Sequence, residues 1–261
     1  MGATGRDVTR PGVSLVPGLV SVTFRRLAAD EVIALVVAHG LRAVEWGGDV
    51  HVPVGDLAVA RDVGRRCADA GIAVAAYGSY FRGTGDFGPV LETAVALGAP
   101  RVRVWAGERG SAAEADRSGV VDGLRRAAEL ATAAGVEVAV EYHANTLTDT
   151  LASALELFAE VPALRPYWQP PVGSSLQDAL VAVPALAPVT AHVFSWDDTG
   201  RRLPLAARGE LWRPVLAELA ALPGTRHVLL EFVRDDDPLA FAEDAAVLRG
   251  WLGGPGWGDD T

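Results

Sequence analysis

A glycine that ends a helix and is followed at once by a β-rich run recurs along this chain, and this repetition restricts the possible folds most strongly. Glycine just past a helix adopts, at little cost, the left-handed conformation that ends the helix. Each such glycine therefore marks the end of one element and the start of the next. The pattern occurs at His39-Gly40 before residues 41–46, Ala70-Gly71 before 72–77, Leu97-Gly98 before 101–105 and Ala134-Gly135 before 136–141.

Eight strand–helix units can be placed in strict alternation, and no linker divides the 261 residues. Alternation predicts a parallel sheet, and eight units in roughly 250 residues predict closure into a barrel. An open doubly wound sheet is the rival, but no G-x-G-x-x-G follows the first predicted strand. We expect an α/β fold with a single (β/α)8 TIM barrel over residues 15–252, a flexible leader over 1–14 and a flexible tail over 253–261. Other predicted strands cover 19–24, 164–169, 189–194 and 227–233, and predicted helices include 151–160, 174–181, 210–222 and 238–252.

The composition excludes several classes of function. Acidic residues outnumber basic ones by 33 to 23, and this net charge of −10 disfavours nucleic-acid binding. The chain has no lysine, which excludes Schiff-base aldolases, pyridoxal phosphate enzymes and Walker phosphate loops. No apolar run approaches the ~20 residues that cross a membrane. The single cysteine, Cys67, excludes an internal disulfide framework and a cysteine-based zinc site, and it favours a cytoplasmic protein.

Polar side chains stand at the ends of the last four predicted strands. In (β/α)8 barrels the active site lies at the carboxyl ends of the strands. Because each of these residues ends its own consecutive strand, we expect them to converge at one side of the barrel mouth. Two carboxylates, an imidazole and an amide oxygen suit one divalent ion, namely Mn²⁺, Co²⁺, Mg²⁺ or Zn²⁺. The predicted ligands are Glu141, Gln169, His192 and Glu231.

Four short segments carry a resemblance to a known group of proteins. They are Val44-Glu45-Trp46-Gly47-Gly48-Asp49-Val50-His51-Val52-Pro53, Val140-Glu141-Tyr142-His143, Ala191-His192-Val193-Phe194 and Leu230-Glu231-Phe232. In their order and placement on the strands, the chain resembles the xylose isomerase-like TIM barrels, the sugar-phosphate isomerase/epimerase superfamily. The resemblance implies a single divalent metal held by a Glu, an Asp, a His and a Glu on the fifth to eighth strands.

The chain departs from that group on the sixth strand. Where the group has an Asp, often with a His three residues on, this chain has Tyr167-Trp168-Gln169 and no second imidazole. Gln169 still offers a carbonyl oxygen but no charge, so a bound ion is expected to be a stronger Lewis acid and more weakly held. A hydrogen bond from Gln169 to a water molecule bound to the metal would explain the residue equally well. The catalytic lysine of true xylose isomerases is also absent.

The resemblance implies a metal-dependent isomerase or epimerase of carbohydrate metabolism. Its substrate would be a small sugar or another α-hydroxycarbonyl compound, which reacts through an enediolate while Glu141 and Glu231 remove and return the proton. A dehydratase of the inosose or dehydroshikimate type would use the same intermediate. An endonuclease IV-like phosphodiesterase needs a His-rich mouth, which five histidines do not favour. A non-catalytic barrel is the last alternative, and pairing of barrels into a homo-oligomer is consistent with the resemblance.

Five further residues are candidates for contacting the polar substrate: Glu45, His51, Trp105, His143 and Arg202. Glu141 and His143 share one face of a strand because side chains alternate, so His143 is expected to face the substrate or support the site. Trp105 offers an aromatic face to the C–H edge of a polyol. Arg202 could hold a carboxylate or phosphate in bidentate fashion. Each also has a plain structural alternative, in core packing, loop packing or solvated charge.

Overall fold

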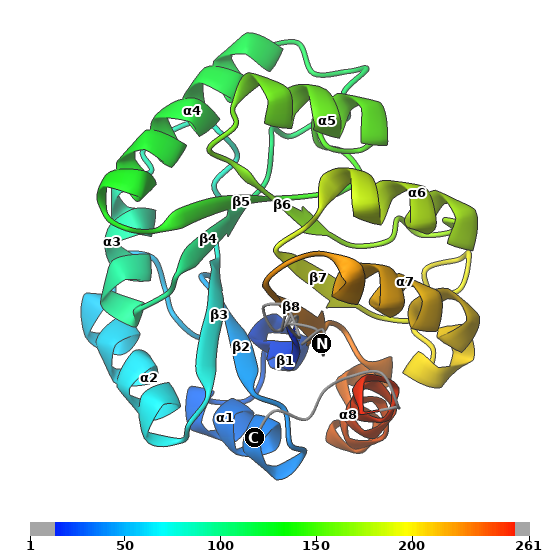
Figure 1. Cartoon of the computed structure of the whole chain (residues 1–261). Helices are drawn as coiled ribbons and strands as arrows, with labels where there is room; N and C mark the ends of the chain where they lie inside the picture. Colours follow the sequence, from blue (N-terminus) through cyan, green and yellow to red (C-terminus); the bar gives the residue numbers. More distant parts are fainter. Residues whose placement is uncertain (1–13, 254–261) are drawn as a thin grey trace, which may run out of the picture.

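The computed structural model describes residues 14–253, and over these residues eight parallel strands close into a barrel with eight α-helices around it (Figure 1). The predicted (β/α)8 fold is therefore confirmed. The strands are β1 (Ser14–Val20), β2 (Ala43–Gly47), β3 (Ala73–Gly78), β4 (Arg101–Val104), β5 (Glu137–Glu141), β6 (Arg165–Trp168), β7 (Thr190–Val193) and β8 (Thr225–Leu230). The helices are α1 (Ala29–Ala38), α2 (Leu57–Asp69), α3 (Gly88–Leu97), α4 (Arg117–Ala133), α5 (Leu151–Glu160), α6 (Leu176–Leu186), α7 (Gly209–Ala221) and α8 (Pro238–Leu252).

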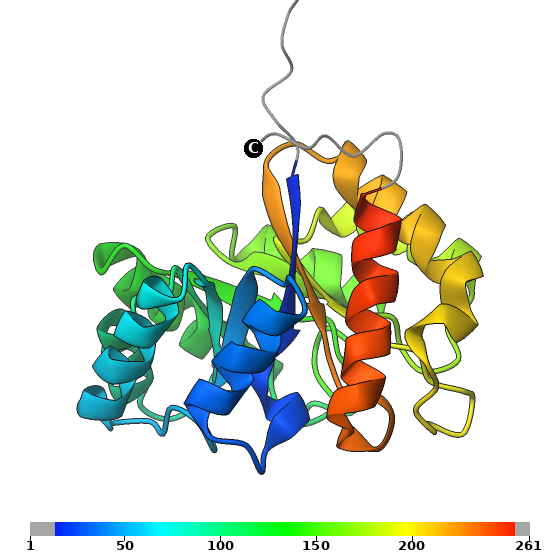
Figure 2. The same ribbon diagram turned by 90° about the horizontal axis from the view of Figure 1, so that it is seen from below.

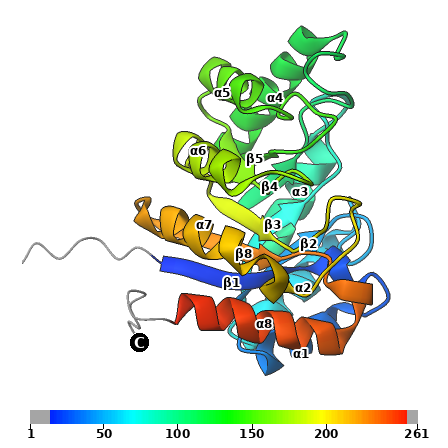
Figure 3. The same ribbon diagram turned by 90° about the vertical axis from the view of Figure 1, so that its right-hand side faces the viewer.

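The barrel closes where β1 pairs with both β2 and β8. Each strand hydrogen-bonds to its neighbours in sequence order, so the chain winds once around the barrel axis. Figures 2 and 3 show the helices packed outside the strands, with α8 running alongside β1 and β8. One apolar core fills the layer between strands and helices, and a smaller one fills the barrel interior, where Val20, Ala75, Ala139, Tyr167 and Leu229 meet.

The glycines that organised the sequence do end helices. Gly40, Gly71, Gly98 and Gly135 all have positive φ, between 66° and 75°. A residue with a Cβ is strained in that conformation, so glycine is the inexpensive choice at these turns. Helices α5 and α8 coincide with the predicted ranges 151–160 and 238–252. Helix α6 continues past the predicted end at 181 to Leu186, through Pro184.

The prediction for the first strand was wrong. Residues 19–24 were expected to form it, but β1 begins at Ser14, and Ser21–Phe24 form a 3₁₀ turn. Proline and glycine are disfavoured inside strands, yet Pro17 and Gly18 both pair with β8. A Cβ on Gly18 would lie 2.3 Å from the Ala43 carbonyl oxygen, so the close approach of β1 to β2 requires glycine there.

The barrel was predicted to begin at residue 15, after a leader over residues 1–14, but β1 begins one residue earlier, at Ser14. The remainder of that leader, residues 1–13, and residues 254–261 of the predicted tail lie outside the described residues. Gly253, the first residue of the predicted tail, caps α8. Within the part of the chain that the structure describes, no helix is long and apolar enough to cross a membrane.

Candidate active site

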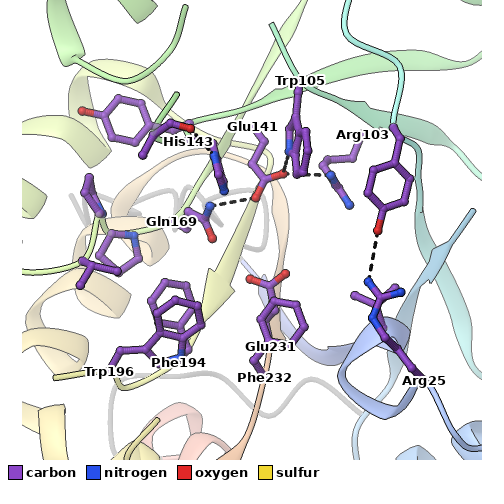
Figure 4. Close-up of a pocket in the computed structure, with 17 residues that line it drawn as sticks. Arg25, Arg103, Trp105, Glu141, His143, Gln169, Phe194, Trp196, Glu231 and Phe232 are labelled. Atoms are coloured by element: carbon purple, nitrogen blue, oxygen red, sulfur yellow. Dashed lines mark hydrogen bonds and ion pairs between the residues drawn. The ribbon is translucent and has the colours of Figure 1, made fainter. Parts of the chain in front are cut away.

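A cavity of about 270 Å³ opens at the carboxyl ends of the strands. Its polar floor comes from four strand ends, and its walls are mostly aromatic (Figure 4). The aromatic walls suit the C–H faces of a small organic molecule, while the polar floor suits its oxygen atoms. The floor contains Arg103, Glu141, Gln169 and Glu231, and the walls include Tyr80, Trp105, His143, Phe194, Trp196 and Phe232.

Two carboxylates of the floor meet an imidazole that lies beneath it. The Nδ1 atom of His192 lies 3.2 Å from Glu231 and 3.6 Å from Glu141. This nitrogen is fully buried, and it has no partner in hydrogen-bonding geometry. Figure 4 shows the carboxylates of Glu141 and Glu231 pointing toward each other across the cavity. The strand-end reasoning thus predicted residues from β5, β7 and β8 that the fold does bring together.

The sequence reasoning missed Arg103, the buried cation of the site. Arg103 lies on β4 with only 5% of its surface exposed. Its Nε donates to Glu45 at 3.1 Å, and its NH1 donates to Glu141 at 3.0 Å. A buried charge is tolerated only where opposite charges and hydrogen bonds compensate its lost hydration. A signal was present: Arg103 lies two residues before the predicted site residue Trp105, so the two side chains are expected on the same face of the chain.

Glu45, expected to contact substrate, lies beneath the cavity and does not line it. Its side chain is fully buried, between Arg103 and His192, with the His192 Nε2 atom at 3.2 Å. The Tyr167 hydroxyl also donates to it. Burial alone would raise the pKa of Glu45, but the charges of Arg103 and His192 lower it to about 2. Glu45 is therefore an ionised support that orients His192 from behind.

Glu141 accepts hydrogen bonds on both carboxylate oxygens. Arg103 and the Trp105 indole N–H donate to one oxygen, and the Gln169 amide donates to the other at 2.9 Å. Burial raises the pKa of Glu141, but the Arg103 charge and His192 outweigh it and lower the pKa to about 2. Glu141 is thus held ionised in one orientation. Among its donors, Trp105 and Gln169 were predicted site residues, and both line the cavity.

The other predicted substrate contacts take different places. His143 lines the cavity and stacks on Trp105, with ring centroids 5.1 Å apart. His51 is buried against the Leu27 carbonyl oxygen, 3.1 Å from its Nε2, and does not line the cavity. Arg202 pairs with Asp236 and lies over the Phe232 ring, so it braces the cavity wall from outside.

The negative charges of Glu141 and Glu231 favour a bound proton or metal ion between the two carboxylates. Although burial lowers the pKa of His192, Glu231 and Glu45 raise it well above its usual range. Either a proton or a metal ion on Nδ1 would satisfy this field. Ligands bound to one divalent ion at roughly 2.1 Å lie roughly 3.0–3.4 Å apart, close to the distances from His192 to Glu231 and Glu141.

The donor types therefore fit a divalent ion, although residues 14–253 contain no preformed metal site of three or more His, Cys, Asp or Glu side chains. The Gln169 amide turns its N–H toward Glu141. Exchange of its nitrogen and oxygen by a 180° turn would present a ligand oxygen instead. The Nδ1 atom of His192, which has no hydrogen-bond partner, is the best candidate for a metal ligand.

Comparison with known proteins agrees with this architecture. The profile of the xylose isomerase-like TIM barrel family matches residues 33–250, which is most of the chain. The chain belongs to this family. Members include epimerases and a dehydratase, so family membership indicates an enzyme scaffold without distinguishing isomerase from lyase.

Individual relatives illustrate that range. A 3-dehydroshikimate dehydratase of Bacillus anthracis is 43% identical over 63 residues, which cover 23% of this chain and 22% of that protein. A solved structure of a probable 3-DHS dehydratase from the same organism is 19% identical and superposes with a TM-score of 0.75, covering 90% of this chain and 99% of that one. A D-allulose 3-epimerase from Methylomonas sp. is 15% identical, with a TM-score of 0.63 over 93% and 100% of the chains.

One solved relative was obtained with a metal. A xylose isomerase-like TIM barrel protein from Mycobacterium smegmatis, in complex with magnesium, is 16% identical with a TM-score of 0.63. The match covers 87% of this chain and 90% of that one. At these identities the superpositions show a shared fold.

Proposed function

We propose that this protein is a metal-dependent isomerase or epimerase that enolises a small polyhydroxylated carbonyl compound. The observation that carries the proposal is the Glu141–His192–Glu231 cluster, whose two carboxylates line the floor of an aromatic-walled cavity. A cavity of about 270 Å³ suits a molecule the size of a single sugar. Its polar floor and apolar walls match the oxygen-rich edge and the C–H faces of such a molecule.

The metal would be held by Glu141, His192 and Glu231, with the Gln169 carbonyl oxygen as a fourth ligand. When bound, it supplies the Lewis acidity that polarises a carbonyl and stabilises the enediolate. Side chains of the protein position the ligands and transfer the proton. Glu45, beneath the floor, holds His192 in place, and Arg103, on the floor, holds Glu141.

The two glutamates are proposed to exchange the proton, with unequal roles. Three donors hold Glu141, so its orientation is set and its basicity is reduced. Glu231 contacts only His192 among the described charged groups, which leaves an oxygen free to take a proton from the substrate carbon. We therefore assign Glu231 as the base that begins the reaction and Glu141 as the partner across the substrate.

Dehydration is the second candidate, because it shares the enediolate. If a hydroxyl lies β to the carbonyl, the enediolate formed by the same proton removal can expel it, and a proton returned by the glutamate pair leaves with it as water. The similarity to dehydroshikimate dehydratases supports this outcome. Arg25, which lines the cavity, would also suit a carboxylate-bearing substrate. The two outcomes differ in the leaving group of the substrate and not in the first proton transfer.

Proton exchange with solvent tests the shared step. The protein would be incubated in D₂O with Mn²⁺, Co²⁺, Mg²⁺ or Zn²⁺ and with fructose, an inosose or 3-dehydroshikimate, followed by NMR. We expect deuterium next to the carbonyl, with an epimer or isomer as product for an isomerase and a dehydrated product for a lyase. Glu231→Gln should slow exchange by at least about 10³-fold, as the loss of a general base does.

A matched control is available at the cavity rim. Arg202→Gln changes a residue that braces the wall without lining the cavity, so it should leave the exchange rate within a few-fold of wild type. Exchange that proceeds equally fast in Glu231→Gln and wild type would refute the assigned base. Absence of exchange for every substrate and every metal would refute the proposed enzyme class.

A further inference from the structure

The backbone of Phe232 adopts a left-handed conformation directly after Glu231, the assigned base. Its φ angle is 51°. This conformation is rare for a bulky residue, because the Cβ atom crowds the backbone, whereas glycine adopts it without strain. Strain of this kind persists only where the surrounding structure compensates for it, and it is concentrated at functional sites.

The turn places two consecutive side chains in the same cavity. Along a strand, neighbouring side chains point to opposite faces. If the chain continued as a strand beyond β8, the side chain after Glu231 would therefore point away from the cavity. Both Glu231 and Phe232 nevertheless line it (Figure 4), and Trp196 packs beside the Phe232 ring with centroids 6.2 Å apart. The left-handed turn thus adds an aromatic ring to the cavity wall next to the carboxylate.

Thr23 compensates for this strain from the opposite end of the chain. It lies in the 3₁₀ turn after β1 and is only 1% exposed. The backbone N–H of Phe232 donates to the Thr23 hydroxyl oxygen at 3.0 Å, across 209 residues of sequence. The N–H of Glu231 donates to the Val193 carbonyl oxygen at 3.1 Å, which continues the pairing of β8 with β7. Thr23 therefore holds the backbone at the point where it leaves the barrel.

An apolar ring beside Glu231 bears on the fate of the transferred proton. The proton leaves the substrate carbon for a carboxylate oxygen of Glu231. From there it can return to the same carbon or exchange with water. A ring that covers the carboxylate restricts the approach of water and favours return to the carbon.

We infer that Thr23 is a positioning residue, which keeps the Phe232 ring beside Glu231 and thereby shields the transferred proton from water. Thr23 does not line the cavity, so it acts through Phe232. The inference rests on the proposed function, because it needs Glu231 to carry the proton.

Deuterium incorporation in D₂O tests the shielding. With Mn²⁺ and either fructose or 3-dehydroshikimate, the deuterium in the recovered substrate is divided by the amount of product. This ratio measures proton loss to water per turnover, so a smaller fraction of folded protein does not change it. Thr23→Val keeps the shape of the side chain but removes the acceptor, and it should raise the ratio at least about threefold. Thr23→Ser keeps the acceptor and should behave like wild type.

Thr93 provides a control of the same chemistry. It is a fully buried threonine on α3, its hydroxyl oxygen accepts from the Gly55 N–H at 2.9 Å, and it does not line the cavity. Thr93→Val should therefore leave the deuterium ratio unchanged. A rise as large as that in Thr23→Val would indicate a general loosening of the barrel and overturn the inference.

The amide proton of Phe232 tests the contact without any reaction. Its NMR signal is assigned, in protein labelled with nitrogen-15 at phenylalanine, by its loss in Phe232→Leu. The signal should move upfield in Thr23→Val, because the hydrogen bond is lost, and stay in place in Thr93→Val. An unmoved signal in Thr23→Val would overturn the inference whatever the activity. Absence of exchange with every substrate would instead refute the proposed function.

Two substitutions of Phe232 keep the inference testable if Thr23→Val does not fold. Phe232→Gly and Phe232→Ala both remove the ring and should raise the deuterium ratio. Glycine tolerates the left-handed conformation and alanine does not, so the glycine variant should melt at the higher temperature. An unchanged ratio in both variants, or a higher melting temperature for the alanine variant, would overturn the inference.

Discussion

Arg103 is the residue on which the electrostatics of the site depend. It joins a carboxylate on β2 to one on β5, and all three side chains are almost fully buried. Burying one partner of such a network without the other leaves an unpaired charge in a medium of low polarity. The same network fixes Glu141 and, through Glu45, the orientation of His192.

Replacing Arg103 by Met should therefore destabilise the protein by about 3–5 kcal/mol, because two buried carboxylates lose their cation. Urea unfolding would measure this loss. The double variant Arg103→Met with Glu45→Gln should be less destabilised than the sum of the two single changes. Arg65→Met on the exposed face of α2 serves as the control and should change stability by less than about 0.5 kcal/mol. Strict additivity in the double variant would argue against the bridge.

Two residues away from the site, the half-buried His227 and the buried Asp244, titrate in opposite senses. Burial and the Arg101 charge lower the pKa of His227 to about 4, so its contribution to stability is lost as pH falls from about 6.5 toward 4. Burial raises the pKa of Asp244 to about 6, despite a hydrogen bond from Leu205. Its contribution is therefore present below about 4 and lost as pH rises through about 6. Between pH 4 and 6 the two effects offset each other.

Replacing one of these two residues at a time should reveal how the other makes the free energy of unfolding depend on pH. In Asp244→Asn, the free energy of unfolding should fall more steeply than in wild type as pH drops from 6.5 to 4. In His227→Gln it should fall less steeply. Each difference is at most about 3 kcal/mol, since one pKa unit corresponds to about 1.4 kcal/mol. Urea titrations at several pH values would measure it, and parallel curves for wild type and both variants would contradict the assignment.

At the scale of elements, α4 is fixed by a close contact with the loop after β3. A Cβ on Gly123 would lie 1.7 Å from the carbonyl oxygen of Gly83. The helix can approach that backbone only because residue 123 lacks a side chain. A sequence reading finds only a helix-weakening glycine in α4, because the contact joins segments 40 residues apart.

Alanine substitutions at two helical glycines should thus act in opposite directions. Gly123→Ala should destabilise the protein by about 1–3 kcal/mol through overpacking. Gly250→Ala in α8 meets nothing within 4 Å and should stabilise it by up to about 1 kcal/mol, because alanine favours the helix. Thermal unfolding of both variants would measure the contrast. A stabilising Gly123→Ala would show that α4 does not approach the loop so closely.

At the scale of the whole molecule, a metal would connect four strands that lie far apart in the chain, from β5 to β8. Ligand binding to the folded state alone stabilises it, by about 2.7 kcal/mol at 100 times the dissociation constant. The barrel should accordingly melt at a higher temperature with Mn²⁺ or Co²⁺ than after treatment with a chelator. This rise should vanish in His192→Ala and persist in Glu129→Gln, which removes an exposed carboxylate on α4.

Gln169 stands where the resemblance implies an Asp, and this difference leads to a further prediction about metal affinity. Gln169→Asp adds a carboxylate to a set that now has two, so it should bind Mn²⁺ at least about tenfold more tightly. Calorimetry on chelator-treated protein would measure both affinities. Equal affinities would place residue 169 outside the set of ligands, in contact with Glu141 alone.

Local pattern and chain order by themselves determined the barrel and its strand ends. Left-handed glycines and alternating elements are set by neighbours in sequence, and strand ends of a parallel barrel must meet at one mouth. The order of the strands therefore sufficed to predict that Glu141, Gln169, His192 and Glu231 lie together. The start of β1 could not be predicted in this way, because the pairing of Pro17 and Gly18 with β8 depends on barrel closure.

Only the tertiary structure decided how the charges are distributed. Arg103 pairs with Glu45 across 58 residues of sequence, and Glu45 reaches His192 across 147. No local pattern encodes such pairings, because burial and neutralisation arise when distant strands come together.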